Sequence, residues 1–175
     1  VQLGLESRFL DSSVVGDTNG TDFTDLFNLN ALVFGNSFVP TNVYARRDES
    51  ILDQNFAGSV DILTTEVGIV SNIRSTVAPT TVRLFHLEYD QSDLLGTTSS
   101  SLDQNTIAVQ SNITIAPNHK LDVNATVDQI HQTQNNDFEN DPSRIDVLLT
   151  DTYTFGRQGS NSLRSYLRYY SEAGD

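Results

Sequence analysis

Three residue types are missing from this 175-residue chain, which contains no cysteine, methionine or tryptophan. Without cysteine there can be no disulfide framework, thiolate zinc site, iron–sulfur cluster or cysteine nucleophile. Only three histidines are present, which disfavours a multi-histidine metal centre. The missing start methionine leads us to expect a processed or cut product. No apolar run approaches the roughly 18 to 20 residues of a membrane-spanning helix.

Basic residues are also scarce. The chain carries 10 Lys and Arg against 23 Asp and Glu, a formal net charge of -13. Proteins that bind nucleic acid neutralise the phosphate backbone with clustered Lys and Arg. This composition therefore argues against a nucleic-acid partner.

Alternation of apolar and polar residues is the dominant pattern along the chain. Segment 121–128 alternates strictly, with Leu121 and Val123 on one parity and Asp122 and Asn124 on the other. A period of two is typical of a strand with one apolar face. Similar patterns predict further strands, most of them about ten residues long, as membrane-spanning strands are. The predicted strands are 1–10, 25–35, 41–47, 59–73, 81–90, 106–115, 121–131, 144–155 and 163–171.

The predicted connections alternate between long and short. In an up-and-down meander, alternate connections lie at the same end of the sheet, so the long ones gather at one end. The long connections contain many Asp and Glu but no Lys or Arg, whereas the short ones contain no acidic residue. The long connections are 11–24, 48–58, 91–105 and 132–143, and the short ones are 36–40, 74–80, 116–120 and 156–162. The sequence thus predicts an acidic end and a mildly basic end.

Two predicted hairpins, 105–130 and 144–170, combine long amphipathic strands with turns at Ala116-Pro117-Asn118 and at Gly156. With this alternation of loops, the chain resembles a bacterial outer-membrane β-barrel of the porin-like, up-and-down kind. A bilayer cannot hydrate backbone amides, so strands cross it only in a closed barrel. The resemblance implies an all-β fold, an antiparallel up-and-down meander of about nine long strands that forms a transmembrane β-barrel or part of one. It also implies the cell outer membrane as location, with membrane lipid and lipopolysaccharide as partners.

The predicted strand count is odd, whereas bacterial barrels have an even number of strands. The chain also ends in Ser171-Glu172-Ala173-Gly174-Asp175 rather than in an aromatic strand residue. We therefore expect residues 1–175 to form a single β-meander segment that is incomplete at its C-terminal end. Further strands of the same protein, or a partner chain, would complete it.

The polar parity of the strands is the candidate functional surface. A charged, hydrated interior suits a water-filled pore, whose selectivity follows its lining charges. We predict a passive pore or conduit rather than an enzyme, since no Gly-x-Ser-x-Gly motif occurs. We therefore predict no catalytic residue. The predicted pore-lining residues are Glu6, Arg8, Arg46, His86, Glu88, Asp122, Asp128, Asp146, Arg164 and Arg168.

No cofactor-binding or metal-binding residue is predicted. His119 falls in a short turn and His131 at the edge of a long connection, so opposite ends of the sheet should separate them. The acidic connections could nevertheless bind divalent cations weakly through carboxylate oxygens. This would help an acidic surface to sit among anionic lipid head groups.

A secreted or cell-surface structural module is the alternative. In a filament, surface layer or adhesin subunit, the polar parity would be the solvated face of an ordinary antiparallel sheet. Strand donation from a neighbour would then complete the sheet, and the protein would be extracellular. Periodicity alone does not separate this interpretation from the barrel.

Two positions break the expected pattern. Asp151 has the parity of the lipid-facing side of its strand. Segment 59–73 changes apolar parity between Ile62 and Val67, which predicts either a β-bulge or an extension of the strand beyond the membrane.

Overall fold

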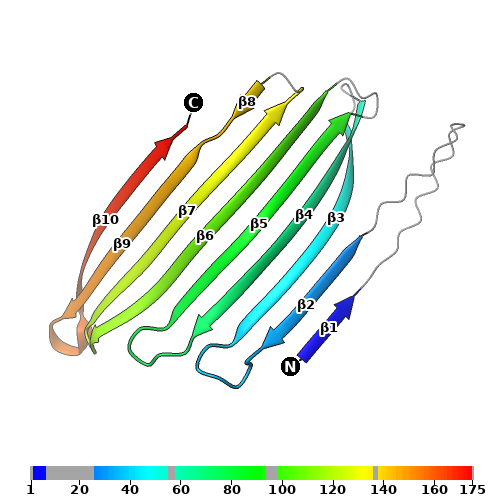
Figure 1. The fold of residues 1–175 in the computed structure, drawn as a ribbon. Coiled ribbons are helices and arrows are strands. Elements are labelled where there is room, and N and C mark those ends of the chain that lie inside the picture. Colours follow the sequence, from blue (N-terminus) through cyan, green and yellow to red (C-terminus); the bar gives the residue numbers. More distant parts are fainter. Residues whose placement is uncertain (1, 7–25, 55–57, 94–97, 136–137, 175) are drawn as a thin grey trace, which may run out of the picture.

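The computed structural model of this chain describes residues 2–6, 26–54, 58–93, 98–135 and 138–174. They form one antiparallel sheet in which nine strands lie side by side in chain order, so the prediction of an all-β, up-and-down meander is confirmed (Figure 1). The strands in this order are β1 (Gln2–Glu6), β2 (Phe27–Val33), β3 (Thr41–Gln54), β4 (Gly58–Ile73), β5 (Thr80–Asp93), β6 (Ser99–Ala116), β7 (His119–Gln134), β9 (Ser143–Phe155) and β10 (Asn161–Ala173). The sheet is open, with β1 and β10 at its edges.

Two short elements complete the description. Strand β8 (Phe138–Asn140) pairs with the end of β7, and a single 3-10 turn, η1 (Arg157–Gly159), connects β9 to β10. No helix in the described part of the chain is long and apolar enough to span a membrane. We call the end of the sheet with the turns 34–40, 74–79, 117–118 and 156–160 the short-turn end, and the opposite end the long-loop end.

Several strands run further toward the long-loop end than predicted. The predicted connections 48–58 and 91–105 were wrong in part, because β3 continues to Gln54, β5 continues to Asp93 and β6 begins at Ser99. The added strand segments, 48–54, 91–93 and 99–105, are rich in polar residues, and such a composition favours the prediction of a loop. They contain no proline or glycine to interrupt the ladder, and each has a long neighbouring strand that supplies backbone partners.

Pairing of β4 is continuous with both β3 and β5 over the described residues, so a β-bulge in segment 59–73 was wrong. The apolar residues simply change sides along the strand, with Val60 and Ile62 on one face and Val67 and Ile69 on the other. A register shift occurs instead in β6, between Thr114 and Ala116, next to the short turn that leads to β7.

The sheet has no second layer among the described residues, and burial is inverted relative to an ordinary domain. Among the Val, Leu, Ile, Phe and Tyr side chains whose burial the structure describes, Val60 is the single buried one. The buried polar side chains are Glu66, Thr106, Ser111, Asp128 and Thr150. Interiors normally exclude acidic side chains unless these are paired. The hydrogen bonds around Glu66 and Asp128 are therefore central to the structure.

Candidate functional site on the polar face of the sheet

Cross-strand pairing sorts the side chains onto two faces. One row of paired residues runs across six strands and is aliphatic throughout: Val43, Ile69, Leu84, Ile107, Val127 and Ile145. We call this side the apolar face. The adjacent row on the other side contains Tyr44, Gly68, Phe85, Thr106, Asp128 and Arg144, and we call that side the polar face.

Glu66 of β4 is the centre of the largest hydrogen-bonded group on the polar face. Tyr44 Oη donates to Glu66 Oε1 at 2.5 Å, and Arg46 Nη2 donates to Glu66 Oε2 at 2.5 Å. Arg83 Nη2 from β5 donates to Glu66 Oε1 at 2.8 Å and to Tyr44 Oη at 3.2 Å. Strands β3, β4 and β5 thus place two guanidinium groups around one buried carboxylate, whose charge they compensate.

Gly68 makes room for this arrangement. Tyr44 and Gly68 are directly opposite each other across β3 and β4. A Cβ at position 68 would lie 2.6 Å from both Cζ and Oη of Tyr44. The tyrosine ring therefore lies over the glycine backbone, and from there its hydroxyl reaches Glu66. A glycine inside a strand often marks such a close approach.

A second buried carboxylate, Asp128, lies on β7. Thr106 Oγ1 of β6 donates to Asp128 Oδ1 at 2.6 Å, and Gln104 Nε2 donates to the same oxygen at 3.1 Å. Gln104 also donates to Thr106 Oγ1 at 3.0 Å. Here neutral side chains make the hydrogen bonds to the buried acid, and Arg144 is directly opposite it on β9.

A third group lies near the β10 edge and is more open. Arg168 binds Asp146 of β9 in a bidentate manner, with Nε to Oδ1 at 3.0 Å and Nη2 to Oδ2 at 2.7 Å. A shallow depression of about 370 Å³ lies beside this pair and is also lined by Asn124, Leu148 and Tyr166. The planar fork of arginine matches a carboxylate in this geometry, which fixes both side chains across the two strands.

The structure brings most of the predicted pore-lining residues onto one face. Pairing places Arg46, Asp122, Asp128, Asp146, Arg164 and Arg168 on the polar face. Glu6 pairs with Asn28, which pairs with Arg46, so its backbone position belongs to the same row. Arg8 lies outside the described residues.

His86 and Glu88 do not share that face, and their predicted placement was wrong. They pair with Asn105 and Asp103 on the side that carries Leu84 and Ile107. Both parities of β5 contain apolar residues, with Val82 and Leu84 on one and Phe85 and Leu87 on the other. Alternation alone therefore could not orient this strand, and the pairing with β4 and β6 decides it.

Sequence reasoning missed Glu66, Tyr44 and Arg83, which make up the best-connected group. A signal was available, since Arg83 stands between Val82 and Leu84, inside a strand. A charged residue at such a position must face away from the apolar side, and it needs a partner there. The identity of that partner depends on cross-strand register, which the sequence does not reveal.

Basic residues are concentrated on the polar face. Apart from Arg47, every Lys and Arg in the described strands lies there: Arg46, Arg83, Lys120, Arg144, Arg164 and Arg168. Acidic residues accompany them, so this face carries mixed charge. Toward the long-loop end, the charged residues of the apolar face are instead mainly acidic, among them Glu49, Glu88, Asp90 and Asp103.

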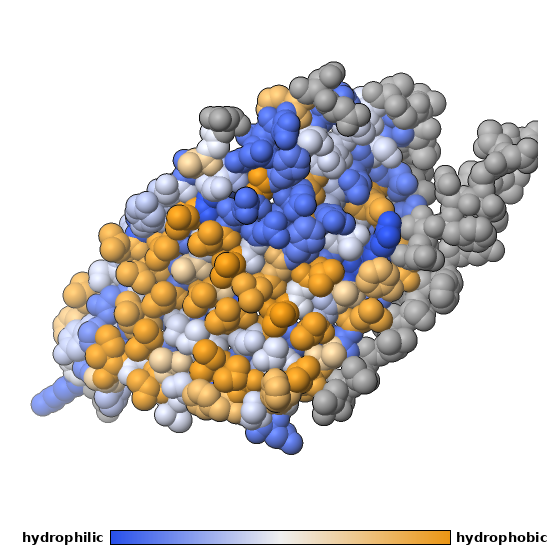
Figure 2. Space-filling model, viewed as in Figure 1, coloured by the Kyte–Doolittle hydropathy of each residue, from blue (hydrophilic) through white to orange (hydrophobic). Residues whose placement is uncertain are grey.

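The apolar face exposes a broad band of large hydrophobic side chains nearer the short-turn end, with a hydrophilic zone toward the long-loop end (Figure 2). The exposed members on this face are Leu29, Val43, Val67, Ile69, Leu84, Ile107, Val127, Ile145, Tyr153, Phe155, Leu163, Leu167 and Tyr169. A contiguous apolar surface of this extent marks a region that contacts something other than water.

Asp151 interrupts this band close to the short-turn end, and it has a partner. His119 Nε2 lies 2.7 Å from Asp151 Oδ1. The His119 ring packs edge-on against Tyr153, which stacks on Phe155 at a centroid distance of 6.0 Å. The charge that broke the sequence pattern is thus paired and flanked by aromatic rings.

Comparison with known proteins identifies no similar protein. No protein-family model matches the chain, and no curated protein or solved structure is significantly similar to it.

Proposed function

We propose that this chain forms part of the wall of an outer-membrane β-barrel, with its polar face lining the lumen of a passive pore or conduit. The observation that carries the proposal is the inversion of burial, in which paired carboxylates are buried and aliphatic side chains are exposed. A transmembrane barrel has this distribution, because its outer side faces lipid while its interior holds polar groups and water.

The height of the apolar band supports the same proposal. On β9 the band runs from Ile145 to Phe155, both of which are exposed on the apolar face. Ten steps of about 3.3 Å span about 33 Å along the strand. At the usual tilt of about 40°, this becomes about 25 Å along the membrane normal, the typical height of the apolar belt of a barrel.

The open edges call for additional strands. β10 pairs with β9 on one side, and nearly all of its side chains are exposed. A long unpaired edge offers a row of backbone donors and acceptors that a bilayer cannot hydrate. We propose that further strands of the same protein, or a partner chain, close the barrel in the cell outer membrane. Lipid would cover the apolar band, and lipopolysaccharide would meet the acidic zone toward the long-loop end.

The same free edge favours a second candidate function. In a secreted or cell-surface structural module, β10 would accept a strand from a neighbouring subunit, and the apolar face would pack on another protein. The two candidates make opposite predictions about what covers Ile107.

A single tryptophan can report what covers each face, because the natural chain has none. We would compare Ile107→Trp on the apolar face with Gln110→Trp on the polar face, two exposed positions of β6. After reconstitution into vesicles, quenching by brominated lipid chains should be strong for Ile107→Trp and weak for Gln110→Trp. A conductance measurement on the same vesicles then tests the pore.

Two outcomes of these measurements would contradict the proposal in whole or in part. If the chain remains in the aqueous phase without detergent, and brominated lipid quenches neither tryptophan, the barrel proposal fails and the structural module is favoured. If Ile107→Trp is quenched but the vesicles show no conductance, the membrane location stands and the pore does not.

A further inference from the structure

Histidine and acidic side chains meet on the apolar-face side of the sheet, at its long-loop end and beyond the hydrophobic band. Glu88, Asp103 and His131 form one cross-strand row over β5, β6 and β7. On the other side of β7, β8 pairs Gln132 with Asn140 and Thr133 with Glu139. The next position opposite His131 is Asp141. Strand pairing therefore brings Glu139 and Asp141 onto the same face as His131.

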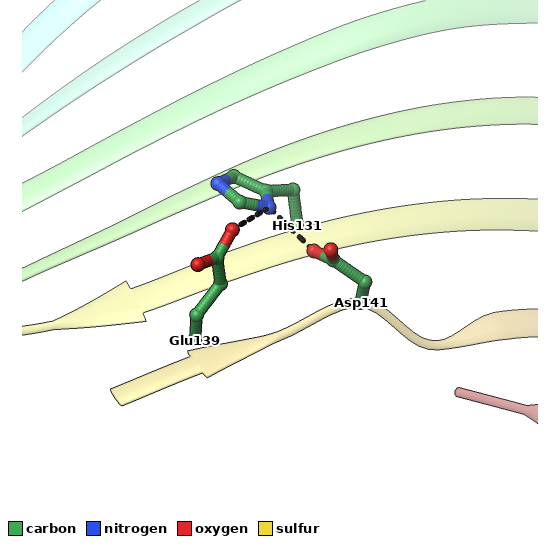
Figure 3. A group of neighbouring side chains, drawn as sticks. All are labelled: His131, Glu139 and Asp141. Atoms are coloured by element: carbon green, nitrogen blue, oxygen red, sulfur yellow. Dashed lines mark hydrogen bonds and ion pairs between the residues drawn. The ribbon is translucent and has the colours of Figure 1, made fainter. Parts of the chain in front are cut away.

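The three side chains converge on one point (Figure 3). His131 Nδ1 is hydrogen-bonded to Asp141 Oδ1, and Glu139 Oε1 lies 3.8 Å from the same nitrogen. One ligand atom from each residue lies within 4.8 Å of the other two, a spacing that a single metal ion can bridge. The backbone beneath them is ordered by pairing, since Ile130 N–H donates to Pro142 O at 3.0 Å just behind the group.

No Lys or Arg of the described chain compensates the negative charge of the carboxylates around His131. The ion pairs that Glu88, Asp103, Glu139 and Asp141 make with described residues all go to His86 or His131, and none goes to Lys or Arg. These carboxylates therefore attract a positive charge, which a metal ion can supply.

We propose that His131, Glu139 and Asp141 form a binding site for a divalent first-row transition-metal ion, with Zn²⁺ as the best match. One imidazole nitrogen with two carboxylate oxygens suits Zn²⁺, whereas Ca²⁺ and Mg²⁺ take oxygen ligands alone. Asp103, Asn105 and Gln129 help to line a pocket of about 260 Å³ beside His131 and Asp141, which leaves room for water ligands. The site goes beyond the proposed function and does not depend on it.

The sequence pattern predicts no metal site, since His119 and His131 fall at opposite ends of the sheet. The structure likewise keeps His119 and His131 at opposite ends of β7. What it adds is the placement of two carboxylates, from a segment that the sequence marks only as acidic, next to one histidine. His86 also has two carboxylates in reach, but they lie on opposite ring nitrogens, with Glu88 at 3.3 Å from Nε2 and Asp103 at 3.4 Å from Nδ1. Among the described residues, a histidine nitrogen and two carboxylate oxygens converge within 4.8 Å of one another only at His131.

Equilibrium dialysis of the full chain against Zn²⁺, read by elemental analysis, tests this site. We expect the natural chain to bind one Zn²⁺ saturably. Loss of even an outer-shell partner weakens metal sites by about 10 to 100-fold, so His131→Ala and Asp141→Asn should each weaken binding by at least about tenfold. His119→Ala is the matched control, because His119 also contacts one carboxylate, and this variant should bind like the natural chain.

The side chains at the site are exposed, so their replacement should leave the fold intact, and circular dichroism checks this. Three results of the dialysis with Zn²⁺ alone would overturn the proposal. They are the absence of saturable Zn²⁺ binding by the natural chain, unchanged binding by folded His131→Ala, or binding that is lost in His86→Ala instead. Ca²⁺ that competes equally with Zn²⁺ would also overturn it, since the imidazole would then play no part.

Discussion

Neighbouring residues on the two faces of the sheet experience opposite environments. Glu66 is 4% exposed, whereas Val67, the next residue along β4, is 46% exposed. Thr106 and Ile107 of β6 repeat the contrast, at 5% and 50%. In a domain folded in water the apolar member of each pair would be the buried one. Here the hydrophobic effect between side chains of the described chain cannot account for the arrangement.

The stabilising interactions of the two faces therefore come from different sources. The two buried carboxylates of the polar face are satisfied within the chain, because Tyr44, Arg46 and Arg83 bind Glu66, and Thr106 binds Asp128. The apolar face is removed from water only when something apolar covers it. One face is therefore specified by hydrogen bonds within the chain and the other by its surroundings, and substitutions can test the two separately.

The largest effect is expected where a charge is placed on the apolar face. Val127→Arg should destabilise the chain by about 2–4 kcal/mol in a bilayer, because a cation in the apolar band loses its hydration. Thr126→Arg is the matched control on the polar face, where Asp146 lies directly opposite on β9. Urea unfolding in vesicles measures both, and equal destabilisation by the two variants would contradict the contrast between the faces.

On the polar face the strongest effect is expected at Glu66. Glu66→Ala leaves Tyr44 without its acceptor. It also removes the negative charge that lies between the guanidinium groups of Arg46 and Arg83. We expect a loss of about 2–3 kcal/mol in the free energy of unfolding, below the full penalty for a broken buried ion pair because both guanidinium groups reach water. Glu66→Gln keeps an acceptor for Tyr44 and should cost less. A neutral result for Glu66→Ala would mean that the group is not needed for the fold.

Gly68 offers a finer test of how the polar face is packed. In Gly68→Ala the new Cβ would lie 2.6 Å from the Tyr44 ring, so the ring must move and its hydrogen bond to Glu66 lengthens. We expect a loss of about 1–2 kcal/mol. With Tyr44→Ala already present, the same change should cost much less, and this non-additivity in a double-mutant cycle is the critical observation. Additive effects would show that the ring does not cover Gly68.

The smallest effect is expected at His131, outside the hydrophobic band. Its pKa is raised above the free value of 6.5 by Asp141, Glu139 and Asp103. The protonated histidine therefore stabilises the fold below about pH 6.5, and this contribution is lost as pH rises through the folded pKa. NMR titration in the presence of a chelator should give a pKa above 6.5 that Asp141→Asn lowers. His119, at the other end of β7, should not respond to that substitution.

Prediction from sequence succeeded where local alternation was strict. Segment 121–128 has one residue type on each parity, and β7 presents Asp122 and Asp128 on the polar face as expected. It failed in β5, where Leu84 and Phe85 are both apolar, and so His86 and Glu88 were assigned to the wrong face. It also ended β3 and β5 too early, because polar segments without proline or glycine remain strands when a neighbour pairs with them.

The sequence by itself determined that this chain is an antiparallel meander of long amphipathic strands, because a period of two and the spacing of turn residues are local properties of the chain. Which side chains meet was decided only by the tertiary structure. Glu66, Tyr44 and Arg83 lie on three different strands, and only cross-strand register brings them together. The same holds for His131 and its two carboxylates, since β8 must pair with β7 before an acidic segment becomes a set of ligands.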